Sequence, residues 1–250
     1  MTTMLAIDTK RALRDPGIIF IIGIPVLMYL IFGAAQEYGQ ETIGNGNVAM
    51  AIMVGMSAYG AASATISLAT TAAVERLQGW GRQLSLTPLP TGKYILIKSL
   101  TAVLFATITI AIIYAVAAPT GAEATPSAWA QSFIVLLLGS LPFAMFGLAL
   151  SYLFRSEVAT AVGSGLLLLA AFAGNLFVPL SGALLDFSRF TPMWGYITLA
   201  RWPVTEGYWT TSQGIPYSDE LWQGALSLGV WTVIFAVFAT VVMRRKGARP

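Results

Sequence analysis

The stretch GIIFIIGIPVLMYLIFGAA, residues 17–35, decides the fold class because it contains no charged side chain. A helix of about 20 apolar residues is long enough to cross the roughly 30 Å hydrocarbon core of a bilayer. A secretory leader has a shorter apolar core of about 7–15 residues, so an anchored helix is favoured over a cleaved signal peptide. Residues 17–35 therefore predict a membrane span, with a kink at Pro25.

The rest of the 250-residue chain is equally apolar, since 56% of its residues are hydrophobic and only 10% are charged. A soluble domain carries about 25% charged residues. Because a backbone in lipid must satisfy its own hydrogen bonds, each charge-poor interval is expected to be a helix. Further spans are predicted at about 48–73, 97–118, 129–154, 158–180 and 221–243. The predicted fold is an all-α integral membrane protein with six transmembrane helices, forming a single domain over residues 1–250.

Basic side chains indicate the orientation, because cytoplasmic loops carry an excess of Lys and Arg. If the N-terminus is inside, Arg189 and Arg201 are the only ones of the 14 basic residues that lie outside. We therefore expect a multi-pass protein of the cell inner or plasma membrane with both termini cytoplasmic. The formal net charge of +3 follows from this bias, so the lipid bilayer is an expected partner and nucleic acid is not.

Three segments outside the spans have patterns of their own. Residues 3–15 combine apolar and basic positions in the way of an interfacial helix. After the second span, apolar residues such as Leu77 and Leu84 recur at helical spacing, which predicts a short amphipathic helix at the inner surface. The prolines of TPLP, residues 87–90, end that helix. Residues 181–220 combine prolines with the tryptophans and tyrosines that are typical of a membrane interface.

Catalytic chemistry is not expected, since the chain has no cysteine and no histidine. Histidine is the commonest general base and metal ligand, and cysteine is a common nucleophile. The sequence TGKY, residues 91–94, lacks the first glycine and the final Ser or Thr of a phosphate-binding loop. We therefore predict no catalytic residue, no metal and no cofactor in this chain.

Asn175 is the strongly polar side chain deep in the fifth expected span. It forms either a helix–helix hydrogen bond or a substrate contact. Aromatic residues interrupt the small-residue faces of the second and fifth spans, where they either pack or contact substrate. With Asn175 they make a candidate substrate path of Tyr59, Phe172 and Phe177.

Small residues on a transmembrane helix let a neighbouring backbone approach closely. The second and fifth spans are rich in them, and such faces serve either a subunit interface or packing within the chain. The candidate interface positions are Gly55, Gly60 and Gly163.

The segment VERLQGWGRQLSLTPLPTGKYILIK, residues 74–98, resembles the conserved loop of the ABC type-2 exporter permeases. The matching positions are Glu75, Arg76, a loop glycine that is either Gly79 or Gly81, Leu84, Thr87, Pro88 and Lys98. The usual small hydroxyl residue after the loop glycine is replaced by Trp80 or Arg82. The resemblance extends to RALRDP before the first span and to FSRFTPMWGYITLARWP before the last, and so covers essentially the whole chain.

This resemblance implies a role for the loop and for the chain. In the family, the loop is a coupling helix that docks on a separate ATP-binding subunit, which carries the ATP and Mg. The coupling residues implied here are Glu75, Arg76, Gln78, Arg82 and Leu84. The resemblance further implies a homodimer or heterodimer of permeases and a re-entrant extracellular segment before the last helix.

The expected function is export of an amphipathic small molecule, either a drug or antibiotic or a lipid. The chain itself would be a transport subunit and not an enzyme. Two alternatives stay open at this point: a non-transport membrane scaffold or sensor partner, and a secondary transporter or channel.

Overall fold

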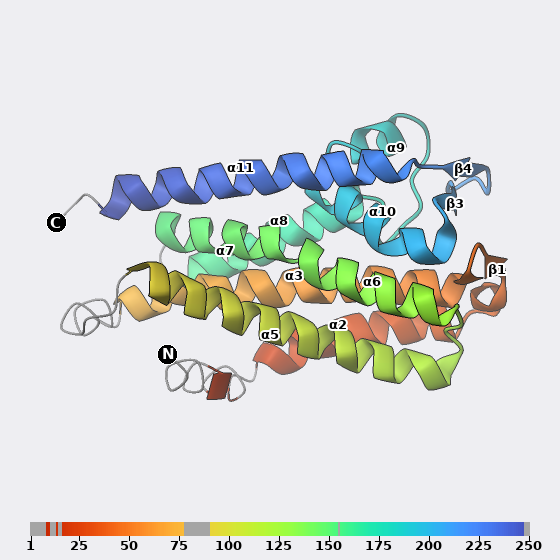
Figure 1. Ribbon diagram of the computed structural model, residues 1–250, viewed down its shortest axis with the longest axis horizontal. Coiled ribbons are helices and arrows are strands. Elements are labelled where there is room, and N and C mark those ends of the chain that lie inside the picture. The colour runs from red at the N-terminus through yellow and green to blue at the C-terminus, as the bar shows by residue number, and fades with distance from the viewer. Residues whose placement is uncertain (1–8, 11–13, 15–16, 78–90, 155, 248–250) are drawn as a thin grey trace.

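The computed structural model describes residues 9–10, 14, 17–77, 91–154 and 156–247 of the chain (Figure 1). The interfacial helix expected over residues 3–15 lies almost entirely outside the described residues. So does the inner-surface segment at 78–90.

Helices make up nearly all of the described structure. The first, α2 (Gly17–Tyr29), continues into a π-helix, η1 (Leu30–Ala34). The long helices that follow are α3 (Val48–Leu77), α5 (Thr91–Ala117), α6 (Pro126–Gly139), α7 (Leu141–Leu153), α8 (Ser156–Ala173) and α11 (Leu221–Gly247). The segment before α11 contains α9 (Gly182–Ser188) and α10 (Pro192–Thr205). The predicted all-α character is confirmed.

Five helical stretches among the described residues are long and apolar enough to cross a membrane. They are Gly17–Ala34, Val48–Thr71, Leu100–Thr120, Pro126–Leu153 and Leu221–Arg244. The fourth stretch is two helices, because α6 ends at Gly139 and α7 begins at Leu141. The apolar part of α8, Val158–Ala173, is shorter than the others. A multi-pass membrane protein is thus confirmed. The count of six spans stays a prediction, since the described residues hold five stretches of sufficient length and one shorter apolar helix.

The fifth expected span, residues 158–180, is wrong at its end. The helix α8 stops at Ala173, and Asn175 takes a left-handed conformation with φ 61°. The N–H of Gly174 bonds to the carbonyl of Ala170, and the N–H of Leu176 bonds to that of Ala171. Asparagine is one of the few residues that tolerate this conformation at a helix C-terminus. The helix therefore ends for a local reason that its apolar composition does not reveal.

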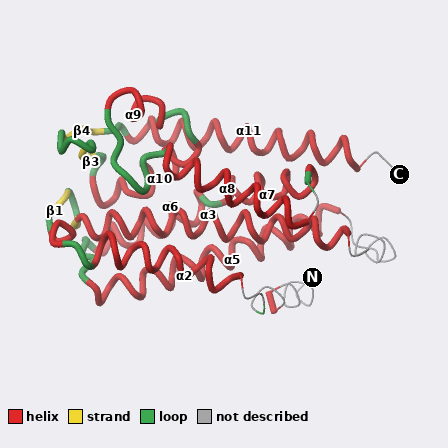
Figure 2. Tube along the Cα trace, turned by 180° about the vertical axis from the view of Figure 1, so that it is seen from behind, coloured by secondary structure: helices red, strands yellow, loops and turns green. Residues whose placement is uncertain are grey.

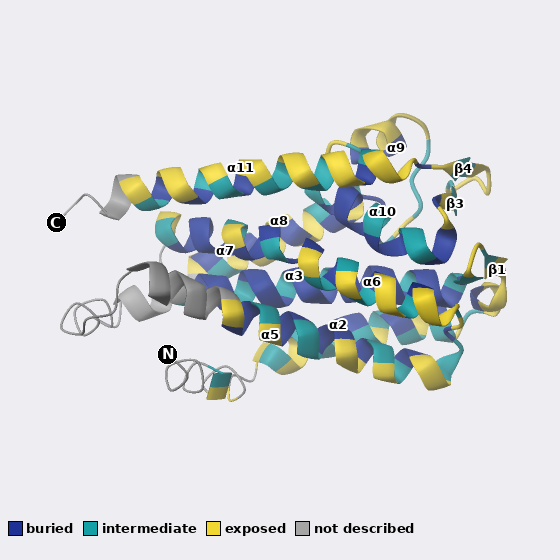
Figure 3. Ribbon diagram, viewed as in Figure 1, coloured by how far each residue is buried: buried dark blue, intermediate teal, exposed yellow. Residues whose placement is uncertain are grey.

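The centre of the bundle is α3, which contacts α5, α7, α8 and α2. In its apolar stretch, Val48–Thr71, 83% is buried inside the protein, whereas only 17% is buried in the apolar stretches of α2 and α11 (Figure 3). Small side chains such as Ala58, Ala61 and Ala62 are completely buried on α3, which lets helices pack on several of its sides. The outer faces of α2 and α11 expose large apolar side chains, as lipid-facing helices do.

One end of the bundle carries short hairpins, and the start of α2 and the end of α11 lie at the other end (Figures 1 and 2). The hairpins are β1–β2 (Thr42–Ile43 and Gly46–Asn47) and β3–β4 (Tyr208–Thr210 and Pro216–Ser218), both antiparallel. Two short 3-10 helices, η2 (Glu37–Gln40) and η3 (Ala118–Thr120), lie in the loops of this end.

Backbone hydrogen bonds join the loops of this hairpin end to each other. Asn45 N donates to Val204 O at the end of α10, and Asn47 N donates to Glu123 O. Gly46 also forms an antiparallel bridge with Ala124. Segments from the first third, the middle and the last fifth of the chain are therefore fixed together at this end.

Candidate functional site: a cavity at the hairpin end

A cavity of about 510 Å³ lies at the hairpin end. Helix α3 contributes Ile52 and Met56 to its wall, the turn after α8 contributes Asn175 and Phe177, and α10 contributes Arg201. Further aromatic lining comes from η1, η2 and β3, which contribute Phe32, Tyr38, Tyr208 and Trp209. Cavities of roughly 300–1,000 Å³ with mostly apolar walls and a few polar groups are typical small-molecule sites.

The buried charged group of this wall is Arg201, which is only 6% exposed. Its Nε donates to Ala51 O on α3 at 3.2 Å, and its Nη2 donates to Leu176 O at 3.1 Å. A longer bond of 3.4 Å joins Nη1 to Asn175 O. The guanidinium carbon also lies 4.7 Å from the centroid of the Trp209 ring, a cation–π distance. Burial lowers the pKa of Arg201 to about 10, so the side chain is still charged at neutral pH.

Gly55 provides the space for this guanidinium. A β-carbon at Gly55 would lie 2.6 Å from Nη2 of Arg201, closer than non-bonded atoms approach. Gly55 is also one helical turn after Ala51, whose carbonyl accepts from Arg201, so both residues lie on the same face of α3. The space left by the missing side chain at Gly55 is therefore filled by a side chain of the same protein, that of Arg201.

Asn175 joins three parts of the site. Its Nδ2 donates to the hydroxyl of Tyr217 on β4 at 2.7 Å, and its Oδ1 accepts from Leu180 N at 2.8 Å. Its carbonyl is one of the acceptors for Arg201. Asn175 was expected inside a helix, where it would bond to another helix or to substrate. The structure instead has it in a turn, bonded to a strand and to its own loop, and still on the cavity wall.

A second, much smaller cavity of about 30 Å³ lies on another side of Arg201 and is also lined by Tyr217 and Asp219. Burial raises the pKa of Tyr217 to about 12, which keeps its phenol neutral. Burial also raises the pKa of Asp219, partly offset by Arg189, whose Nη2 lies 3.3 Å from Oδ1. Arg189 and Asp219 form an ion pair, whereas the structure pairs Arg201 with carbonyls and an aromatic ring.

The structure brings together the residues of the predicted substrate path. The ring of Phe177 lies 5.1 Å from that of Tyr59 and 5.1 Å from that of Phe172. Asn175 and Phe177 line the cavity, while Tyr59 and Phe172 lie behind Phe177. A contact with substrate at any of these residues stays a prediction.

The three predicted interface glycines face neighbours in the same chain. A β-carbon at Gly60 would lie 2.8 Å from Thr109, and one at Gly163 would lie 2.7 Å from Ile66. Gly55 faces Arg201. These contacts match the alternative of packing within the chain, and a subunit interface at these positions stays a prediction.

The predicted coupling residues lie at or beyond the edge of the described structure. Glu75 and Arg76 belong to the last turn of α3. Gln78, Arg82 and Leu84 lie outside the described residues. Their role in coupling stays a prediction.

Sequence reasoning missed the site role of Arg201, which was assigned only to the outer loops. A signal was present, because Ile197, Arg201 and Val204 recur at the spacing of one helix face, and all three are buried. A cation on the apolar face of a helix, next to aromatic residues, indicates a buried charge and therefore a candidate functional residue.

Comparison with known protein families assigns the chain to one family of membrane transport proteins. The model of the family described as ABC-2 family transporter protein matches residues 40–241, so the chain belongs to that family. This membership confirms the resemblance found in the loop after the second span and defines the chain as a transport permease of the ABC-2 type. Such a permease is a non-catalytic membrane subunit that generally works with an ATP-binding subunit.

One relative is a Bacillus subtilis (strain 168) protein named "Putative transport permease YvfS". The chain is 24% identical to it over 187 residues, which cover 74% of this chain and 73% of the relative.

Proposed function

We propose that this permease exports an amphipathic small molecule and that a separate ATP-binding subunit, which holds the ATP and Mg, supplies the energy. The observation that carries the proposal is the cavity of about 510 Å³ at the hairpin end. Its volume suits one drug-sized molecule, and its aromatic wall with a single buried cation suits a cargo with both apolar and polar parts. A long polar glycan would find little to bond on such a wall.

The charge distribution of the sequence supports an orientation of the permease in the membrane, and the resemblance to exporter permeases supports the proposed direction of transport. Most of the basic residues lie in segments other than the hairpin end, which favours a cytoplasmic location for both termini and for residues 78–90. The cavity then lies on the outer side of the membrane, where a cargo is released. In this arrangement the segment with α9 and α10 forms a re-entrant outer layer, and the permease acts as a homodimer or heterodimer in the cell membrane.

Coupling to the ATP-binding subunit is assigned to the segment that follows α3. Charge pairs at a protein interface couple by about 1.5–7 kcal/mol when they are close and desolvated. Reversing the charge at Arg82, or replacing Leu84 with aspartate, should therefore reduce docking of the ATP-binding subunit while the permease still inserts into the membrane.

The test is to co-express the permease with its ATP-binding subunit and to compare two variants, Arg82→Glu and Leu84→Asp, with the control Arg249→Glu near the C-terminus. Co-purification of the ATP-binding subunit and ATP-dependent uptake of an amphipathic dye into inside-out vesicles are measured at matched expression. Both readouts should fall in the two variants and persist in the control. Uptake that needs no ATP would instead favour a secondary transporter or channel, and no uptake with full co-purification would favour a scaffold.

A further inference from the structure

Arg201 has hydrogen-bonding capacity that the described residues do not use. A guanidinium carries five N–H groups. The described residues accept from Nε, from Nη1 and from Nη2 once each. One N–H on each Nη therefore has no acceptor among the described residues. Hydrogen bonds from a guanidinium to a carboxylate or phosphate are charge-assisted and about twice as strong as neutral ones.

The charge of Arg201 is also unneutralised by a carboxylate within the described structure. Asp219 lines the small cavity beside it, but Asp219 pairs with Arg189 at 3.3 Å. Glu41 lines the large cavity, is exposed to solvent and makes no ion pair with Arg201. An exposed carboxylate is screened by water and salt, whereas a buried cation is screened much less. The positive charge therefore dominates the inner wall of the cavity.

Most of the remaining wall is apolar, and the cavity has a limited volume. Ile52, Met56 and Phe177 supply aliphatic and aromatic surface next to the cation. The cavity of about 510 Å³ holds a body of drug size. A free inorganic anion would leave most of that surface in contact with water.

We propose that the cavity beside Arg201 binds an anionic amphiphile, with its carboxylate or phosphate group on the guanidinium and its apolar body against Ile52, Met56 and Phe177. This names the charge class of the cargo and so rests on the proposed function. The ring of Trp209 contacts the guanidinium. Its fluorescence should therefore change when an anion binds to the same cation.

The test uses purified wild-type permease in nanodiscs of phosphatidylcholine, without any ATP-binding subunit. Octyl phosphate, octyltrimethylammonium and octanol share an alkyl chain and differ in charge. Each is titrated while tryptophan fluorescence is followed, and the same titration of Trp209→Phe is subtracted to remove the other tryptophans and partitioning into lipid. Octyl phosphate should bind at least about tenfold more tightly than the other two, since charge-assisted hydrogen bonds are the strong ones. Inorganic phosphate should bind far more weakly than octyl phosphate.

Two variants sharpen the result without removing the bonds that hold α10. Glu41→Gln removes the competing carboxylate from the cavity and should tighten binding of octyl phosphate. Ile52→Phe fills the apolar part and should weaken it. Arg244→Gln is the matched control, because Arg244 is an exposed cation near the end of α11, at the opposite end of the bundle from the cavity, so the preference for an anion should persist.

Equal affinity for the three octyl compounds, or a preference for the cation, would overturn the proposal. Equal affinity for inorganic phosphate and octyl phosphate would also overturn it, since the apolar wall would then contribute nothing. The outcome is separable from the proposed export function. ATP-driven uptake of a cationic dye together with no anion preference would leave export standing and remove only this cargo class.

Discussion

Asn175 fixes the turn that ends α8, and its replacement by alanine should destabilise the protein by an amount that the structure defines. The substitution removes the hydrogen bonds to Tyr217 and Leu180 and leaves a residue with φ near 61° that has no local polar contact. The left-handed conformation costs about 1–2 kcal/mol. Each lost hydrogen bond costs about 0.5–1.5 kcal/mol, so the expected loss is about 2–5 kcal/mol in total.

The assay is thermal unfolding of the detergent-solubilised protein, followed by the loss of its monodisperse peak in size-exclusion chromatography. For a chain of this size, each kcal/mol shifts the Tm by about 2–4 °C, so Asn175→Ala should lower the Tm by at least about 4 °C. Asn175→Gly relieves the backbone strain but not the lost bonds, so it should be more stable than the alanine variant by about 1 kcal/mol. Tyr217→Phe removes one hydrogen bond and should cost about 1 kcal/mol.

The order of the variants tests the reasoning more strictly than the size of any one effect. If Asn175→Ala and Asn175→Gly unfold at the same temperature, the left-handed turn does not determine the end of α8. If Tyr217→Phe is as damaging as Asn175→Ala, the side-chain bond to β4 outweighs the turn.

Three further outcomes are expected. Burial raises the pKa of Asp219 above 3.8, so the folded protein binds this proton more tightly than the unfolded chain does, and the wild type should lose stability as the pH rises through the raised pKa. The variant Asp219→Asn lacks this loss, so its Tm relative to that of the wild type should increase with pH. Because the chain has no cysteine, single-cysteine variants report topology directly: Phe190→Cys should react with a membrane-impermeant maleimide in intact cells, and Arg82→Cys only after permeabilisation. A β-carbon at Gly147 would lie 2.8 Å from a backbone oxygen of α3, so Gly147→Ala should cost about 1–3 kcal/mol, whereas Gly165→Ala meets open space and should be neutral or slightly stabilising.

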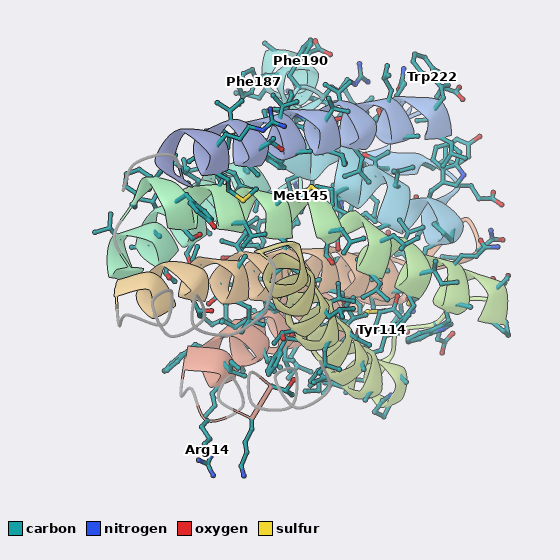
Figure 4. All side chains as sticks on the ribbon, turned by 60° about the vertical axis from the view of Figure 1, so that its left-hand side comes forward. Arg14, Tyr114, Met145, Phe187, Phe190 and Trp222 are labelled. Carbon is teal, nitrogen blue, oxygen red and sulfur yellow. The ribbon has the colours of Figure 1, made fainter. Side chains whose placement is uncertain are left out.

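The maleimide experiment is aimed at an exposed aromatic edge of the hairpin end. Phe187 and Phe190 project outward near α9, and Trp222 projects outward from the start of α11 (Figure 4). Phe190 is 76% exposed and Trp222 is 61% exposed. Aromatic side chains with this exposure are typical of the membrane–water interface, so labelling at Phe190 tests whether this end lies at the outer boundary of the bilayer.

Membrane-spanning segments could be predicted from the sequence because they depend on composition. Residues 17–35, 48–73 and 221–243 match α2 with η1, α3 and α11 closely, since each is bounded by charge or by turn residues. The interruption between α6 and α7 at Ser140 and the end of α8 at Ala173 were not predicted. Both lie inside uninterrupted apolar sequence, where hydrophobicity is the same for a helix and for a turn buried among helices.

The site was less predictable than the spans because its properties come from neighbours distant in the sequence. Asn175 and Phe177 were identified as unusual residues in their span, and both line the cavity. Gly55 was read as part of a small-residue face, although its neighbour is a side chain from α10, far along the chain. Arg201 was counted only as an outer charge, because no local pattern identifies Ala51 and Leu176 as its hydrogen-bond acceptors.

The uninterrupted course of α3 gives the protein a mechanical connection between its two ends. A helix rises 1.5 Å per residue, so Leu77 lies about 39 Å along the axis from Ala51, which is bonded to Arg201. Packing on most sides of α3 restricts sideways bending, so a displacement at one end of the helix would be transmitted along its length. If the Leu77 end of α3 were displaced, Ala51, Ile52 and Met56 would therefore move together. The hydrogen bond from Arg201 to Ala51 O would change with that movement.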